Sequence, residues 1–152
     1  ANKGSYKPSE RVKEIIKTEK LLGLDDVDKL KKFANKVKKS KDDLINLLKR
    51  LKNEGKTIAA YAATSKSTTI FNYCNIDKNL IDYICDTTPI KQGKLSPGMH
   101  IPIVSPEEFK KNPPDYAFLL AWNHADEILS KEKDFIKSGG RWITHVPEVK
   151  IL

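Results

Sequence analysis

The sequence has few of the residues that build metal centres and no run long enough to cross a membrane. Its 152 residues include only two cysteines, Cys74 and Cys85, and three histidines that are not spaced like metal ligands. A tetrahedral zinc site needs four ligands, so no metal site is expected, and both thiols are predicted to be reduced and buried. No apolar run approaches the roughly 18 residues that span a bilayer, and no stretch has the pattern of a secretory leader. We therefore expect a cytoplasmic location and no membrane contact.

Glycine is missing where a nucleotide-binding loop would need it. Residues 56–72 read KTIAAYAATSKSTTIFN, an apolar run followed by small and hydroxylated residues around Lys66. A dinucleotide fingerprint and a Walker loop both require glycines in such a turn, so neither motif is present. Two interpretations stay open. Either the amides of a helix N-terminus bind a phosphate together with Lys66 and nearby hydroxyls, or Ser65 or Ser67 caps the helix and Lys66 is solvated.

Positive charge is concentrated in the first third of the chain. The net charge is +8, and residues 1–56 carry all of it, with 17 Lys and Arg against 9 Asp and Glu; residues 57–152 have 11 of each. Apolar spacing predicts a helix over residues 12–22 that ends at Gly23, and further helix from Asp25 or Asp26 to Leu51. The KKSKDD stretch at 38–43 leaves open whether this is one bent helix or two. We expect residues 1–55 to form a helical leader.

After Gly55, short apolar runs alternate with helical patterns. Strands are predicted at residues 57–61, 81–85, 101–104, 116–122 and 141–146. Helices are predicted at 68–73 and 126–138, and another begins after Ser105, where a proline and two glutamates follow the capping serine. This alternation indicates an α/β domain at residues 56–152, with three layers and a mostly parallel sheet.

Ligands of such a sheet bind outside the carboxyl ends of its strands. Those ends lead into the loops 62–67, 86–93, 122–124 and 145–148. In the second loop, Asp86, Lys91 and Gln92 are candidates for a binding site, with a plain turn as the alternative.

The last two loops also contain candidates, each with a structural alternative. Trp122 belongs either to the site or to the core, and Asn123 either contacts a ligand or caps the next helix. His124 is expected to be a satisfied polar neighbour. Glu148 either accepts a hydrogen bond from a ribose or sugar hydroxyl or only solvates the surface.

The stretch YAATSKSTTIFNYCNI resembles the YGAPAKGNTLLNYCGI-type motif in the C-terminal domain of S-adenosylmethionine-dependent sugar C-methyltransferases. The similarity continues through DTTPIKQGKLSPGMHIPI, PDYAFLLAWNHADEI and GGRWITHVPEVKIL, and the leader NKGSYKPSERVKEIIKTEKLLGL resembles the segment that follows the methyltransferase core. The resemblance covers nearly the whole chain in order. The motif's glycines are replaced by Ala62 and Ser67, its proline by Thr64 and its later glycine by Asn75.

The resemblance implies that residues 56–152 form a Rossmann-like domain at the end of a three-domain enzyme. The only methionine is Met99 and the first residue is Ala1, so we interpret the chain as a piece of a longer protein. In this family a base removes the proton from the carbon next to the ketone of a nucleoside-diphosphate-linked deoxysugar. The carbon of the enolate that forms then accepts the methyl group from the sulfonium. The resemblance places the zinc cluster, the S-adenosylmethionine site and the base upstream, so this chain alone is expected to be inactive and to bind neither cofactor.

The expected partners are therefore a nucleoside-diphosphate sugar and the upstream methyltransferase domain. The matched positions and the strand-end loops together give the predicted substrate-binding residues: Tyr61, Thr64, Ser65, Lys66, Ser67, Thr68, Asn72, Asp86, Lys91, Gln92, Trp122, Asn123 and Glu148.

The lysine-rich leader supports a rival hypothesis, a module that binds nucleic acid or an acidic partner. A basic stripe binds phosphates without reading a sequence. However, Tyr6 and Phe33 are the only aromatic residues in the leader, so a base-stacking platform is lacking, which argues against nucleic acid as a partner. A third interpretation is a connector whose apolar stripe packs on the sheet or on the upstream domain.

Overall fold

The computed structural model describes residue 4 and residues 7–152, so Tyr6 of the leader lies outside the described residues. The chain divides into two compact units, Ala1–Lys39 and Ser40–Leu152. In the first unit, helix α1 (Glu10–Leu22) ends at Gly23, whose φ of 67° allows its amide to bond back to the carbonyl of Lys20. The predicted helix end at Gly23 is thus confirmed.

Helix α2 (Val27–Asn53) is one uninterrupted helix that continues from the first unit into the second. Its start is capped by Asp26, whose carboxylate accepts hydrogen bonds from the amides of Asp28 and Lys29. Farther along, Leu44, Leu48 and Leu51 are buried in the core of the second unit. The compact domain therefore begins earlier than the predicted leader ends.

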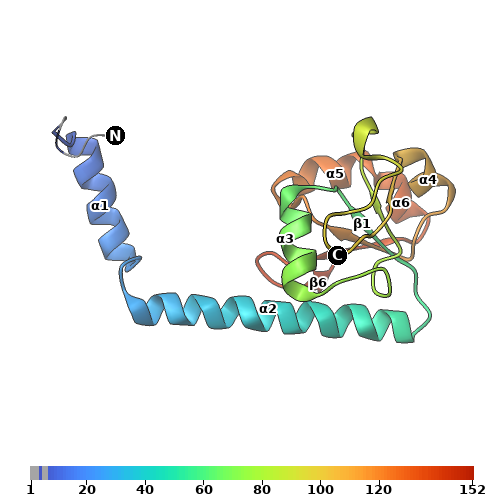
Figure 1. Cartoon of the computed structure of the whole chain (residues 1–152), viewed down its shortest axis with the longest axis horizontal. Helices are drawn as coiled ribbons and strands as arrows, with labels where there is room; N and C mark the ends of the chain where they lie inside the picture. The colour runs from blue at the N-terminus through green and yellow to red at the C-terminus, as the bar shows by residue number, and fades with distance from the viewer. Residues whose placement is uncertain (1–3, 5–6) are drawn as a thin grey trace. The chain divides into compact units, whose positions relative to one another are not determined.

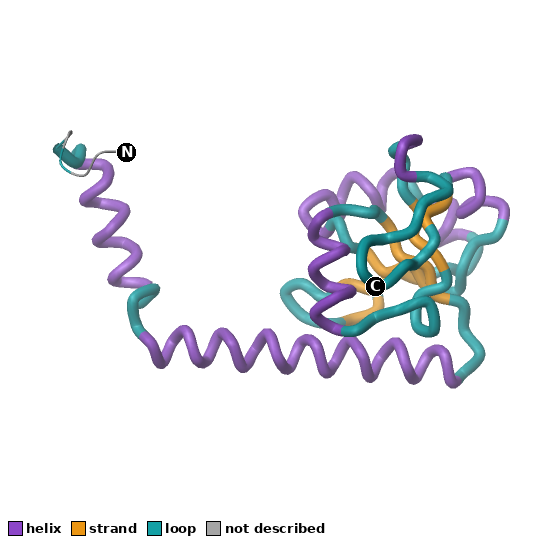
Figure 2. The backbone as a smooth tube through the Cα atoms, viewed as in Figure 1, coloured by secondary structure: helices purple, strands orange, loops and turns teal. Residues whose placement is uncertain are grey.

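The second unit is built on a six-stranded sheet in the order β3-β2-β1-β4-β5-β6. The strands are β1 (Ile58–Tyr61), β2 (Tyr83–Cys85), β3 (Ile103–Val104), β4 (Tyr116–Leu119), β5 (Arg141–Thr144) and β6 (Lys150–Ile151). All pairs are parallel except β5 with β6. The expected α/β fold with a mostly parallel sheet is confirmed, and Figure 2 shows the strands in orange among the helices.

Helices cover both faces of the sheet, which gives three layers. Alternate residues of β1 separate the two cores: Ile58 and Ala60 pack with α2 and with α3 (Ser65–Cys74), whereas Ala59 and Tyr61 face the opposite side. That side is covered by α4 (Pro106–Lys111), α5 (Ala125–Lys131) and α6 (Lys133–Lys137) (Figure 1). Both cysteines are buried and free, as predicted.

Three details differ from the sequence prediction. Residues 126–138 form two helices because Glu132 turns inward, 3% exposed, and accepts a hydrogen bond of 2.7 Å from the Tyr61 hydroxyl. The strand predicted at 116–122 ends at Leu119, and Trp122–His124 form a short 3₁₀ helix, η2. Strand β6, which pairs antiparallel with β5, was not predicted. A second 3₁₀ helix, η1, spans Pro89–Lys91.

We expect Leu48→Ala to lower the free energy of unfolding by about 2 to 5 kcal/mol, because it removes buried methyl groups and leaves a cavity. Leu48 is 0% exposed, whereas Leu30 on the same helix is 50% exposed. Leu30→Ala is therefore the matched control and should change stability by less than about 0.5 kcal/mol. Urea unfolding followed by circular dichroism measures both. Equal effects would contradict the assignment of residues 40–53 to the domain core.

Candidate functional site

The strand order predicts where a ligand binds. From β1 the chain passes through α3 to β2 on one side, and it reaches β4, on the other side of β1, through α4. Since α3 and α4 cover opposite faces, the topology switches between β1 and β4. In open α/β sheets, the crevice outside the carboxyl ends at such a point is the usual ligand site.

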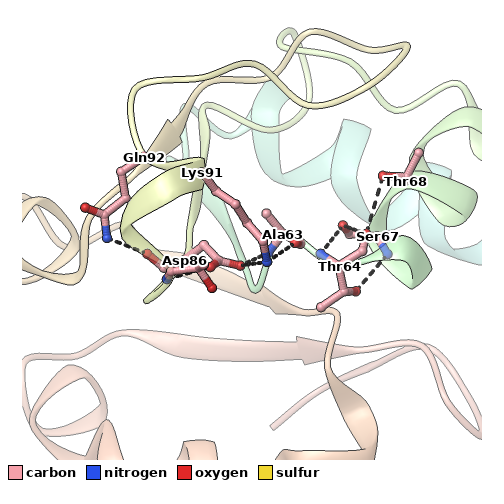
Figure 3. Close-up of polar contacts among 8 residues, drawn as sticks. Ala63, Thr64, Ser67, Thr68, Asp86, Lys91 and Gln92 are labelled. Carbon is pink, nitrogen blue, oxygen red and sulfur yellow. Dashed lines mark hydrogen bonds and ion pairs between the residues drawn. The ribbon is translucent and has the colours of Figure 1, made fainter.

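Helix α3 begins at this point with a reciprocal cap. The Thr64 side chain accepts a hydrogen bond from the Ser67 amide (3.2 Å), and the Ser67 hydroxyl accepts one from the Thr64 amide (2.8 Å). The Ser67 hydroxyl also donates to the Thr64 carbonyl, and Thr68 donates more weakly to the same oxygen (Figure 3). Thr64 and Ser67 are therefore engaged in fixing the shape of the turn.

The cap leaves two amides of the first turn unused. Within the part of the chain that the structure describes, the amides of Ser65 and Lys66 make no hydrogen bond. Both residues are exposed, and they lie at the positive end of the α3 dipole. This end of the helix can therefore accept an anion.

The backbone of Ala62 adopts a conformation that normally requires glycine. Its φ is 79°, and its amide donates to the carbonyl of Cys85 (2.8 Å). At the other end of α3, Asn75 has a φ of 53° and provides the C-cap. Asparagine tolerates this left-handed region better than alanine does. Two positions where the resembled motif has glycine thus keep a glycine-like backbone in this chain.

The buried carboxylate of Asp86 ties the ends of β1 and β2 together. One oxygen accepts a hydrogen bond from the Ala63 amide (2.7 Å), and the other accepts one from the Thr88 amide (2.8 Å). The Lys91 ammonium lies 3.2 Å from the first oxygen and donates to the Ala63 carbonyl, and Gln92 donates to the Asp86 carbonyl (Figure 3). The predicted candidates of this loop are brought together, with the Lys91 charge matched by Asp86.

These contacts decide the charge of Asp86. Burial raises the pKa of this carboxyl group, but the hydrogen bonds from Thr88, Ala63 and Lys91 outweigh burial, so the pKa lies below its ordinary value. Asp86 is therefore an ionised structural clamp at neutral pH.

Lys66 connects the α3 turn to the end of β4. Its ammonium donates to the side-chain oxygen of Asn123 (2.7 Å) and lies 5.2 Å from the centre of the Trp122 ring. These three residues, predicted from two separate loops, thus form one cluster across the switch point. Lys66 makes no ion pair with a carboxylate among the described residues, so its charge remains available to an anion.

A cleft of about 340 Å³ opens beside this cluster, between the strand ends and α5. It contains four predicted residues, Tyr61, Thr64, Asp86 and Lys91. It also contains residues outside the predicted substrate-binding set: Thr87, Thr88 and His124 from the predicted loops, and Cys85, Glu127, Ile128 and Lys131. The residues from α5 were missed because their contribution depends on where that helix crosses the sheet edge.

Two acidic groups in the cleft are held in their protonated form. Burial raises the pKa of the Cys85 thiol to about 12, so it is not a thiolate nucleophile at neutral pH. Burial also raises the pKa of the Tyr61 hydroxyl, and its hydrogen bond to Glu132 adds to the shift. The cleft therefore suits binding better than covalent or proton-transfer chemistry.

The remaining predicted residues lie outside the cleft. The Asn72 amide donates to the carbonyls of Thr68 (2.8 Å) and Pro97 (3.1 Å), so it holds the 92–102 loop against α3. Glu148 is exposed on the segment after β5. Neither of them joins the Lys66 cluster.

His145, at the carboxyl end of β5, is a buried group without a partner. Its ring is 7% exposed and packs edge-on against Phe118 and Trp122, with centroids 5.2 and 5.0 Å away. Neither ring nitrogen has a hydrogen-bond partner among the described residues, and burial lowers its pKa to about 4. Such a histidine stays neutral near pH 7.

Among the described residues, no group of three or more Cys, His, Asp or Glu side chains is arranged to hold a metal ion. No helix in the same residues is long and apolar enough to cross a membrane.

Comparison with known proteins adds two findings. The family model described as the C-methyltransferase C-terminal domain matches residues 1–147. The C-methyltransferase NovU of Streptomyces niveus is 36% identical over 141 residues, which are 93% of this chain and 34% of NovU. The chain thus spans about a third of the length of this relative.

We expect Ala62→Gly to raise the free energy of unfolding by about 0.5 to 1 kcal/mol. A left-handed conformation costs an L-residue roughly 1 to 2 kcal/mol, and the greater freedom of glycine in the unfolded chain offsets part of the gain. Ala63→Gly is the control, because Ala63 has no positive φ and should lose stability. Thermal unfolding measures both variants. A loss of stability in both would show that the left-handed backbone at Ala62 does not destabilise the fold.

The stability of the domain should depend on pH through His145. In the folded chain this ring stays neutral to about pH 4, whereas in the unfolded chain it gains a proton near its ordinary pKa of 6.5. The unfolded chain then binds more protons in this window, so the free energy of unfolding should fall by roughly 3 kcal/mol as the pH drops from about 6.5 to 4.

Urea unfolding across this pH range measures the effect. His145→Phe should remove that part of the pH dependence, and His100→Asn, at an exposed position, should retain it. An unchanged pH profile in His145→Phe would show that another group is responsible.

Proposed function

The chain belongs to the family of C-methyltransferase C-terminal domains, and from this premise we propose that it forms the substrate-binding wall of an enzyme that methylates a nucleoside-diphosphate-linked deoxysugar. The base, S-adenosylmethionine and zinc are assigned to the rest of that enzyme. The methyl group comes from S-adenosylmethionine when it is bound there. The role of this chain is to bind and orient the sugar nucleotide.

The observation that carries the proposal is the free N-terminus of α3 at the topological switch point. A diphosphate placed there accepts hydrogen bonds from the amides of Ser65 and Lys66 and a charge-assisted bond from the Lys66 ammonium. The Thr64–Ser67 cap and the Asp86 clamp hold the turn in one shape before the ligand arrives. Binding therefore does not have to order the loop.

The neighbouring cleft suits one ring of the substrate. Its volume of about 340 Å³ is near the lower end of the roughly 300 to 1,000 Å³ that is usual for small-molecule sites. Thr88, Glu127 and Lys131 offer polar groups for hydroxyls there. A nucleotide sugar is larger than this cleft, so the other part of the substrate requires walls from elsewhere in the enzyme.

The groups in the cleft support a binding role over a catalytic one. Cys85 and Tyr61 are kept protonated, and Asp86 already accepts bonds on both carboxylate oxygens. None of the three suits the removal of a proton next to a ketone. We assign the base to the rest of the enzyme, as the resemblance to the family implies.

A titration with thymidine diphosphate or uridine diphosphate, followed by amide NMR signals, tests the proposal. Signals of residues 63–69 should shift, those of 86–93 should shift less, and those of the leader should stay unchanged. Lys66→Ala should weaken binding by roughly 10- to 100-fold, because a charge-assisted hydrogen bond contributes about 1.5 to 3 kcal/mol. Lys78→Ala, another exposed lysine, serves as the control.

Two results would contradict the proposal. Shifts confined to the leader lysines Lys31, Lys32, Lys36, Lys38 and Lys39 that vanish in moderate salt would favour the basic-module hypothesis. No response at millimolar ligand would show that this turn binds no diphosphate.

A further inference from the structure

The helices of the first unit carry an exposed row of large apolar side chains. In α1, Val12, Ile15, Ile16 and Leu22 recur at helical spacing, and none of the residues of α1 is buried. Helix α2 carries a second such row, Val27, Leu30, Phe33 and Val37, and Phe33 is 66% exposed. We call these eight residues the leader stripe. Several large apolar side chains exposed on one face of a helix are typical of an interaction site.

The leader stripe is continuous with an interface that is already formed. On α2, Leu30, Phe33 and Val37 are followed at matching three-, four- and seven-residue spacings by Leu44, Leu48 and Leu51. The last three are buried against the sheet, while the first three are exposed. The C-terminal part of this apolar row is therefore packed in the domain core. The N-terminal part is exposed, although it consists of the same kind of large apolar residues.

Lysines border the stripe on both edges. Lys29 and Lys36 directly precede Leu30 and Val37, and Lys31 and Lys38 directly follow them. Consecutive residues of a helix are about 100° apart, so one pair lies along each edge. Residues 1–39 contain 12 Lys and Arg against 6 Asp and Glu, a net charge of +6. A surface that covers the stripe must therefore accommodate positive charge on both sides.

The lysines along the stripe indicate which kind of partner binds it. A second copy of the chain would bring lysine edges against lysine edges, which disfavours self-association. Nucleic acid would pair with the lysines and leave the apolar row uncovered. A protein groove that is apolar in the middle and carries carboxylates along its rim satisfies both features.

The family match starts at residue 1, so the leader is part of the family's domain. About two thirds of the length of NovU lies outside the region that matches this chain, and that part could supply the groove.

We propose that the leader stripe docks into an apolar groove rimmed by Asp and Glu on the remaining part of the C-methyltransferase. The choice of the rest of the enzyme as the partner rests on the proposed function. Its physical basis is separate, because the stripe shares no residue with the Lys66 turn. Docking of this kind orders the leader and fixes the substrate-binding domain to the part that performs the chemistry.

Hydrogen exchange of a chimera tests the docking. The region of NovU that matches this chain is replaced by the 152 residues, and amide exchange of residues 10–37 is compared between the chimera and the chain alone. Protection should rise about tenfold or more in the chimera, because docking suppresses local opening of the helices. Leu30→Asp and Phe33→Asp should abolish this rise. Lys32→Asp, on the opposite face of α2, should retain it although it changes the charge more.

Several outcomes would overturn the proposal. Equal amide protection in the chimera and in the chain alone would do so. A dimer of the chain alone, seen in sedimentation and dissociated by Phe33→Asp, would favour self-association instead. Phosphatidylglycerol vesicles that protect the chain alone as strongly as the chimera does would favour a membrane surface. If the chimera does not fold, aspartates at the NovU positions that align with Leu30 and Phe33 should speed exchange in the aligned helices. No change there would also refute the docking.

The two proposals can fail independently. Phe33→Asp should leave the nucleoside diphosphate response of residues 63–69 intact. A chimera that protects the leader while Lys66 shows no ligand response would refute the proposed diphosphate site and support the docking.

Discussion

The candidate site depends on one buried carboxylate. Asp86 is 5% exposed and accepts amide hydrogen bonds from the turn after β1 and from the loop after β2, while Lys91 balances its charge. These bonds add to the one between the Ala62 amide and the Cys85 carbonyl, and together they tie the two adjacent strand ends. A buried carboxylate is tolerated only when it is paired and hydrogen-bonded, and here both conditions are met. The clamp fixes the direction in which the chain leaves β1.

The shape of the α3 turn follows from that direction. Ala62 takes a left-handed backbone so that its amide can reach the Cys85 carbonyl, and Thr64 and Ser67 then close the reciprocal cap. In the resembled motif a glycine stands at position 67, whereas Ser67 of this chain is buried and uses its hydroxyl in the cap. The serine thus takes part in the turn without covering the free amides of Ser65 and Lys66.

Sequence reasoning predicted the parts that local patterns decide. The strand positions, the cap of α4 at Ser105 and the end of α1 at Gly23 all rest on residues that are close in sequence. Thr64, Ser67, Asp86 and Lys91 could be grouped because parallel strands bring their carboxyl ends together. The break at Glu132 could not be predicted, since it depends on Tyr61 far earlier in the chain. The α5 side of the cleft was missed for the same reason.

Helix α2 contributes different residues to the domain core and to the proposed docking surface. Its C-terminal leucines are part of the core on which β1 rests, and β1 leads into the turn with Lys66. Its N-terminal half carries the exposed apolar row with lysines along both edges. Both proposals therefore involve α2: its C-terminal part packs in the core beneath β1, and its N-terminal part carries the residues of the proposed docking surface. Because the cleft is smaller than a nucleotide sugar, the proposed function requires further walls from the rest of the enzyme.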